Sequence, residues 1–232
     1  MNKALIVAPS WIGDTIRLVP RMREWVGQHY PGTRLAVSEY DFYEHDQPLG
    51  AVAYAEVLGI FGREGLDAAT AWSAPDPDQP AFAAYRLFRN FDGKGGAFAS
   101  TSVKVAVSGD PGVEAYAAVD ATRMTVALAS ETGGDTQVTV SLGNFEAGAT
   151  ATLYGNQGGA TIHKLSSPTV DGGAVSFTLP GSSIAMLVID GKNPNDLPDG
   201  GAGSGGAGAG SASSSGGSGA AGTGASSSGG GS

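Results

Sequence analysis

The chain has 232 residues, a net charge of −9 and no cysteine. This acidic balance, without a clustered run of Lys and Arg, argues against a nucleic-acid partner, because neutralising phosphates requires a basic face. Without cysteine we expect neither a disulfide nor a thiolate metal site, and no motif suggests a metal or a cofactor. The apolar runs are too short for a signal peptide or a membrane-spanning helix, so no membrane association is predicted.

The N-terminal third predicts strands that alternate with helices. Residues 4–8 are apolar enough for one buried strand. Apolar residues at helical spacing ahead of Pro31 predict a helix that either begins near Val19, with Pro20 in its first turn, or kinks at Pro20.

The same alternation continues to about residue 90. A strand is predicted over 34–39 and a helix over Leu49–Glu64, with Gly65 in the C′ position that favours glycine. A short strand over 68–72 and a helix over 80–89 follow. Strands and helices that alternate with short loops are typical of βα units and a parallel sheet.

After a glycine-rich turn at 93–96 the pattern changes to short β-rich runs separated by turns. Seven such runs at this spacing predict an antiparallel sandwich. The runs are Val103–Val107, Val113–Val119, Met124–Ala129, Gln137–Leu142, Ala149–Tyr154, Ala174–Leu179 and Ile184–Ile189.

The C-terminal segment has a composition that predicts disorder. Residues 200–232 contain only Gly, Ala, Ser and Thr, which bury too little surface to fold. We therefore expect a flexible linker over 192–232, which suggests a truncated C-terminus or a further module beyond it.

One carboxylate is predicted at the C-terminal end of a strand, which is where parallel barrels place their catalytic residues. Glu39 ends the strand predicted over 34–39, and catalytic side chains project from the C-terminal strand ends of such barrels. Most acidic residues at a strand end are solvated surface groups, so this position alone leaves both interpretations open. The loop acids Asp41, Glu44 and Asp46 are expected to be solvated or capping groups. His45 is expected to be exposed, since no second metal ligand accompanies it.

Four blocks of sequence carry a resemblance to a known family. They are Trp11–Val26, Tyr30–Tyr40, Ala55–Leu66, and Tyr85–Gly95 with Thr101–Val103. In these blocks the chain resembles glycoside hydrolase family 44, which contains bacterial endoglucanases and xyloglucanases. The resemblance implies a fold of class α/β plus all-β. Residues 1–100 would be the C-terminal part of a (β/α)8 barrel, namely its last two βα units, 101–191 a β-sandwich and 192–232 a disordered tail.

The resemblance also implies an activity and its residues. The family performs retaining hydrolysis of extracellular β-1,4-glucans, and its nucleophile falls on Glu39. A retaining glycosidase needs a second carboxyl group as acid/base. The family carries that glutamate on an earlier barrel strand, so we expect no acid/base residue in this chain. Trp72 is expected to serve as a sugar platform or as a core or inter-domain residue, and Tyr40 to line the cleft or to hydrogen-bond the nucleophile.

Two alternative functions remain open at this level. The chain could bind polysaccharide without cutting it, or it could be a truncated and inactive product. The binding alternative is the less favoured one, because all three tryptophans precede the predicted sandwich and a flat cellulose-binding face needs several coplanar rings.

Overall fold

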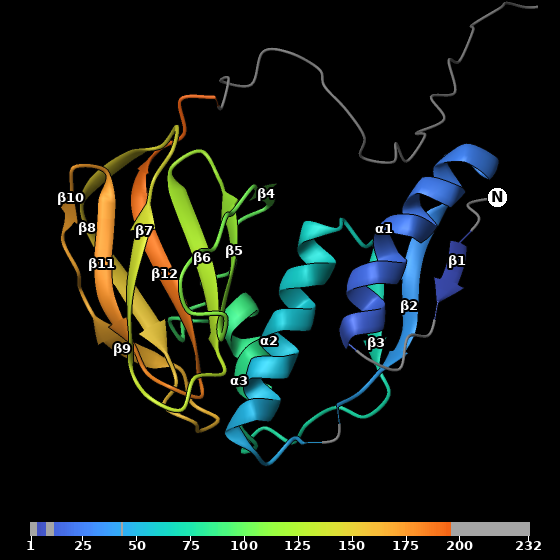
Figure 1. The fold of residues 1–232 in the computed structure, drawn as a ribbon, viewed down its shortest axis with the longest axis horizontal. Coiled ribbons are helices and arrows are strands. Elements are labelled where there is room, and N and C mark those ends of the chain that lie inside the picture. Colours follow the sequence, from blue (N-terminus) through green and yellow to red (C-terminus); the bar gives the residue numbers. More distant parts are fainter. Residues whose placement is uncertain (1–3, 8–11, 43, 196–232) are drawn as a thin grey trace, which may run out of the picture. The chain divides into compact units, whose positions relative to one another are not determined.

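The computed structural model describes residues 4–7, 12–42 and 44–195, and the side chains from residue 18 onward. The chain divides into two compact units, 1–197 and 198–232, and the second unit lies outside the described residues. Within the first unit we distinguish an α/β part (residues 4–98) and an antiparallel part (residues 101–192), drawn from blue to teal and from green to orange in Figure 1. Nowhere along the described ranges is a helix both long and apolar enough to cross a membrane.

The α/β part contains three parallel strands and three helices, in the predicted order. The strands form one sheet in the order β1-β2-β3, and both pairings are parallel. The elements are β1 (Ala4–Val7), α1 (Ile12–His29), β2 (Arg34–Tyr40), α2 (Pro48–Arg63), β3 (Ala68–Ala71) and α3 (Phe82–Arg89).

The first helix differs from one of its two predicted forms. Helix α1 runs from Ile12 through Pro20 to His29, so the expectation that a regular helix begins near Val19 is wrong. Pro20 removes one backbone hydrogen-bond donor inside the helix, and helical turns lie both before and after it. After the helix, Gly32 takes a φ of +80°, a left-handed conformation that glycine adopts without strain.

Helix α2 is confirmed nearly as predicted because local signals fix both of its ends. Pro48 stands in its first turn, where a missing N–H costs little. At the other end Glu64 donates its N–H to the Ile60 carbonyl, and Gly65 follows with a φ of +63°. Its buried residues surround most of the helix, which is typical of a helix covered on more than one side.

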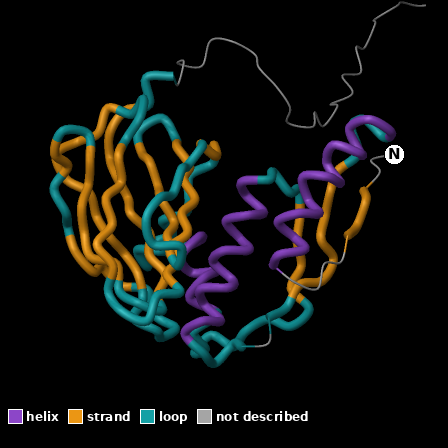
Figure 2. Tube along the Cα trace, in the orientation of Figure 1, coloured by secondary structure: helices purple, strands orange, loops and turns teal. Residues whose placement is uncertain are grey.

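The antiparallel part consists of two sheets. Six strands follow the order β4-β5-β6-β12-β8-β9, and three follow the order β10-β11-β7. In Figure 2 these strands appear in orange, next to the purple helices α2 and α3. The strands are β4 (Thr101–Val103), β5 (Val113–Val119), β6 (Arg123–Ser130), β7 (Thr136–Ser141), β8 (Glu146–Gly155), β9 (His163–Ser166), β10 (Val170–Asp171), β11 (Ala174–Leu179) and β12 (Ser183–Lys192).

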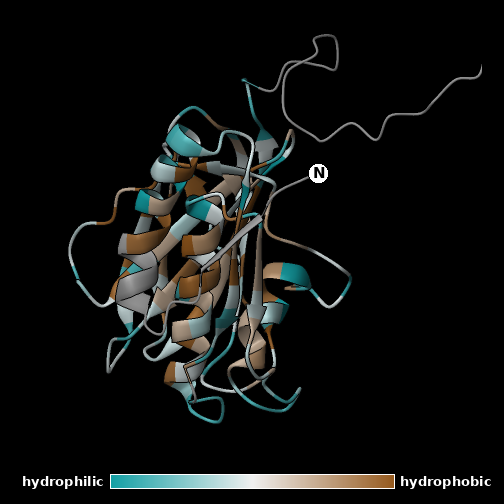
Figure 3. Cartoon of the chain, turned by 90° about the vertical axis from the view of Figure 1, so that its right-hand side faces the viewer, coloured by the Kyte–Doolittle hydropathy of each residue, from teal (hydrophilic) through white to brown (hydrophobic). Residues whose placement is uncertain are grey.

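The six-stranded sheet is buried on both faces. On β12, Ile184 and Met186 belong to a cluster with α2 and α3, whereas Leu187 and Ile189 belong to a cluster with the three-stranded sheet. This double burial explains the continuous apolar run of β12, because neither face of the strand needs polar residues. Strand β7 instead alternates between partly buried and exposed residues, as a strand with one solvated face does. In Figure 3 the brown, apolar residues lie mainly on the helices and strands.

Two strand predictions in this part are wrong. The run Val103–Val107 was expected to be a strand, but pairing with β5 ends at Val103. Strands β9 and β10 were not predicted. They are short edge strands of four and two residues, and a run of that length carries no clear alternation.

Candidate active site

A bulge in β2 determines where Glu39 points. Val37 and Tyr40 both pack into the hydrophobic cluster with α2, although an unbroken strand places only every second residue on one face. The pairing with β3 shifts between these residues, because Val37 lies opposite Ala69 and Tyr40 opposite Ala71. One extra residue on β2 therefore turns Glu39 away from the face that Val37 shares with the helix.

Glu39 is consequently an exposed carboxylate at the C-terminal end of the central parallel strand. Val37 is 1% exposed and Tyr40 is 5% exposed, so Glu39 stands between two core residues. Among the described residues it has neither a hydrogen-bond partner nor an ion-pair partner. Within the described part of the chain, the carboxylate is therefore unpaired and exposed.

Trp72 lies directly after β3 and beside the end of β2. Its backbone N–H donates to the Tyr40 carbonyl at 3.0 Å, which links the two strand ends. Its side chain is 64% exposed, so the expectation of a core tryptophan is wrong. The structure therefore brings together the ends of the two strands that carry Glu39 and Trp72.

The Tyr40 side chain is buried beneath the ends of these two strands. Its hydroxyl is 3.0 Å from the Tyr85 hydroxyl on α3, and its ring meets the Phe61 ring edge-on at a centroid distance of 5.3 Å. Burial raises the pKa of Tyr40, since it disfavours the phenolate. Burial likewise raises the pKa of Tyr85, and the hydrogen bond to Tyr40 adds to this effect.

A polar cluster around the Asp41 carboxylate lies immediately beyond Glu39. One carboxylate oxygen of Asp41 is 2.9 Å from His45 Nε2 and accepts from the Tyr54 hydroxyl at 3.0 Å. Its other oxygen accepts a hydrogen bond from the Ser73 hydroxyl. Burial raises the pKa of Tyr54, and the hydrogen bond to Asp41 raises it further because it stabilises the neutral phenol.

Two predictions for this loop are wrong. The side chains of Asp41 and His45 are 3% and 14% exposed, so Asp41 is not a solvated loop acid and His45 is not an exposed histidine. Each of the two side chains is mostly covered and is hydrogen-bonded to the other. The sequence signal was the spacing of Asp41 and His45, four residues apart, but the two distant hydroxyl groups carry no such signal. Glu44 and Asp46 are exposed, as predicted.

Glu56 on α2 has a carboxyl group with a strongly raised pKa. Burial, followed by the charges of Glu131 and Glu114, raises the pKa of Glu56 to about 7. Glu114 is on β5 and Glu131 follows β6, so Glu56 faces the antiparallel part. It therefore marks the contact between α2 and that part, and not the end of β2.

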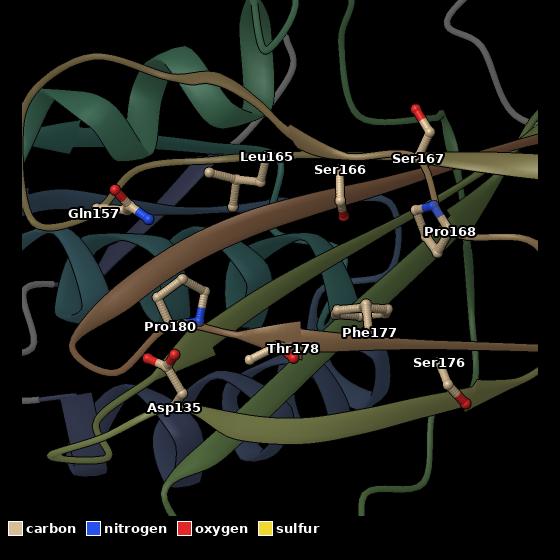
Figure 4. A pocket seen from close by; sticks show the side chains of 10 residues that line it. All are labelled: Asp135, Gln157, Leu165, Ser166, Ser167, Pro168, Ser176, Phe177, Thr178 and Pro180. Atoms are coloured by element: carbon tan, nitrogen blue, oxygen red, sulfur yellow. The ribbon is translucent and has the colours of Figure 1, made fainter.

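A pocket of about 450 Å³ lies in the antiparallel part. Figure 4 shows its lining of serine and threonine hydroxyls, Asp135 and Gln157, with Pro168, Pro180 and the mostly buried Phe177 as apolar surface. Every lining residue follows β6 in the sequence, so neither Glu39 nor Trp72 lines this pocket. We regard the end of β2 as the candidate active site, because an exposed carboxylate and an exposed aromatic ring stand there at the joined ends of two neighbouring parallel strands.

Comparison with known proteins identifies relatives of this chain. No family model matches the chain. The chain is 35% identical over 111 residues to the β-mannanase/endoglucanase A of Caldicellulosiruptor saccharolyticus, a match that covers 48% of this chain and 8% of that protein. CelM2, a bifunctional glucanase-xylanase from a metagenome library, is similar in structure with a TM-score of 0.73 and 39% identity, over 79% of this chain and 36% of CelM2.

These relatives are glycoside hydrolases, and the chain is related to that class. A third relative, Cel44A of Clostridium thermocellum, is a family 44 endoglucanase, with a TM-score of 0.67 and 28% identity over 77% of this chain and 36% of Cel44A. The predicted resemblance to glycoside hydrolase family 44 is therefore confirmed. The chain spans about a third of these two solved structures and less of the curated relative.

Proposed function

We propose that this chain carries the nucleophile of a retaining β-1,4-glucan hydrolase, and that the nucleophile is Glu39. The exposed Glu39 carboxylate at the end of a parallel strand, in a chain 39% identical to a glucanase-xylanase, carries this proposal. Residues 1–100 correspond in it to the end of a (β/α)8 barrel, with β2 and β3 as the strands of its last two βα units. Residues 101–191 correspond to the family's β-sandwich, and the linker expected over 192–232 lies outside the described residues from residue 196 onward.

The proposed reaction has two steps. A carboxylate oxygen of Glu39 attacks the anomeric carbon, the bond to the leaving oxygen breaks, and the bonding electron pair goes to that oxygen as it takes a proton from a second carboxyl group. Water then attacks the anomeric carbon, gives a proton to the second group and releases Glu39. Two displacements retain the anomeric configuration.

We assign the proton donor to a glutamate outside these 232 residues. The resemblance places that residue on the fourth barrel strand, ahead of the strands that we match here. The carboxyl groups next to Glu39 in sequence are poorly suited to the role: Glu44 and Asp46 are exposed loop groups, and Asp41 is hydrogen-bonded to His45 and Tyr54.

Trp72 is the proposed sugar platform. A flat indole ring stacks on the apolar face of a sugar ring, and this ring is 64% exposed next to the end of β2. Tyr40 supports the same surface from below, since its carbonyl holds the Trp72 backbone. The proposed partner is a β-glucan polysaccharide, which implies an extracellular location and allows a further module beyond the linker.

Covalent trapping of the nucleophile tests the proposal directly. The probe is 2,4-dinitrophenyl 2-deoxy-2-fluoro-β-cellobioside, whose phenolate leaves without protonation, so trapping does not require the second carboxyl group. Intact-mass and peptide-mass measurements on the 232-residue chain should show one fluorocellobiosyl group on Glu39. Glu39→Gln should abolish the adduct, and Glu44→Gln, a matched exposed glutamate, should leave it unchanged.

The other outcomes discriminate the alternatives. An adduct that persists in Glu39→Gln would refute the nucleophile assignment. A folded chain that binds cello-oligosaccharides without forming an adduct would favour the non-catalytic binding function. A folded chain that neither binds nor reacts would favour an inactive product.

A further inference from the structure

One buried carboxylate is hydrogen-bonded to both segments that carry the proposed sugar-contacting groups. Asp41 lies two residues after Glu39, and Ser73 lies one residue after Trp72. The hydrogen bond from the Ser73 hydroxyl to Asp41 therefore joins the segment behind the nucleophile to the segment behind the platform.

The rest of the cluster fixes Asp41 itself. The Tyr54 hydroxyl, from α2, donates to Asp41 at 3.0 Å and lies 2.8 Å from His45 Nε2. The His45 carbonyl accepts from the Ala81 N–H at 3.1 Å, just ahead of α3. The cluster thus links the β2–α2 loop, helix α2 and the loop that follows β3.

Regular β-ladder hydrogen bonds do not fix the ends of β2 and β3 relative to each other. The ladder between β2 and β3 is interrupted after Val37 and ends at Tyr40 and Ala71. Beyond that point the described hydrogen bonds between the two segments include the Trp72 N–H to the Tyr40 carbonyl and the Ser73 hydroxyl to Asp41, and then, further along, the Ala81 N–H to the His45 carbonyl. A bulged strand end held by so few bonds depends on side chains for its geometry.

We infer that Asp41 is a positioning residue, which fixes Glu39 relative to Trp72 through its hydrogen bond with Ser73. This inference rests on the proposed function of Glu39 and Trp72. A carboxylate with 3% exposure is costly to bury unless it is hydrogen-bonded, and here its bonds extend to three segments around the site.

The trapping reaction also tests this role, because it gives two separate quantities. One is the labelling rate at saturating probe, and the other is the probe concentration that gives half that rate. Ser73→Ala should lower the saturated rate by about 10-fold, since misplacing a reacting group by about 1 Å costs on the order of 100-fold. Ser73→Thr, which keeps the hydroxyl, should restore it. Asp41→Ala should lower the rate at least as much, and the double variant should be no slower than Asp41→Ala, because both changes remove one interaction.

Controls separate positioning from folding and from the proposed function. Asp46→Ala, an exposed loop aspartate, should react at the wild-type rate, and thermal unfolding should give Ser73→Ala a melting temperature near that of the wild type. A wild-type labelling rate in Ser73→Ala would overturn the inference, and so would rate losses that multiply in the double variant. In either case, labelling of the wild-type chain on Glu39 would still support the nucleophile assignment. If Asp41→Ala does not fold, the two Ser73 variants decide the question. An unlabelled wild-type chain would overturn both proposals.

Discussion

The α/β part and the antiparallel part differ in how fully they bury their strands. Strand β12 is covered by helices on one face and by a second sheet on the other, and Ile184 through Leu187 are all completely buried. No residue of β3 is fully buried, and β2 leaves Glu39 exposed. The residues proposed to meet the substrate therefore lie on or directly after strands with less cover than β12, next to a helix that the better-covered sheet holds in place.

The largest expected effect comes from core truncation in β12, and it tests whether the two parts unfold together. Leu187→Ala and Met186→Ala remove side chains that face opposite clusters, and each should cost about 2 to 5 kcal/mol. Denaturant unfolding followed by tryptophan fluorescence reports only the α/β part, because all three tryptophans precede residue 73. Circular dichroism reports both parts.

Because α2 shares its cluster with Met186, both variants should show one transition with the same midpoint by both probes. A Leu187→Ala chain that loses circular dichroism before fluorescence would show instead that the two parts unfold separately.

A smaller effect is expected where α2 meets the antiparallel part most closely. A methyl group added at Gly59 would lie 2.3 Å from the Tyr116 ring, so Gly59→Ala should destabilise by about 1 to 3 kcal/mol through overpacking. Gly62, on the same helix, has open space at that position, and Gly62→Ala should stabilise by about 0.5 to 1 kcal/mol. Urea titrations of both variants measure this difference, and equal shifts would contradict the close packing at Gly59.

The smallest effect is a pH dependence at the same contact. The pKa of Glu56 rises from 4.5 to about 7 on folding, so the folded chain binds an additional proton between these values. Stability should therefore fall as pH rises from about 4.5 to 7, and Glu56→Gln should remove this loss. At pH 8 the variant should be about 1 to 2 kcal/mol more stable than the wild type, and at pH 4 nearly equal to it.

Unfolding midpoints at the two pH values measure the effect. Glu114→Gln, which changes an exposed neighbour of Glu56, should give a smaller gain. An equal gain for Glu56→Gln at both pH values would contradict a titrating group at this contact.

Features set by short stretches of sequence were predictable. Helix α2 was predicted within one residue of its limits, because Pro48 and Gly65 act within their own turns. The position of Glu39 at a strand end also follows from the apolar run ahead of it. The doubly covered strand β12 was predicted as a strand, but its two partners depend on packing and not on its own residues.

The supporting features of the site were not predictable in this way. The bulge is a mismatch of length between β2 and β3, so neither strand reveals it alone. The cluster around Asp41 joins residues 4, 13 and 32 positions away in sequence. Single-sequence patterns detect the first of these separations at most, and only the fold brings the others together.

The position of α2 between two sheets limits how the gene can be recombined. Ile60 on this helix shares one cluster with Tyr116 and Ile184, so an exchange of segments at residue 100 would separate side chains that pack together. All members of both clusters precede residue 190, so an exchange after residue 195 would leave them intact. The α/β and antiparallel parts should therefore be inherited as a pair, whereas segments attached beyond residue 195 are free to vary.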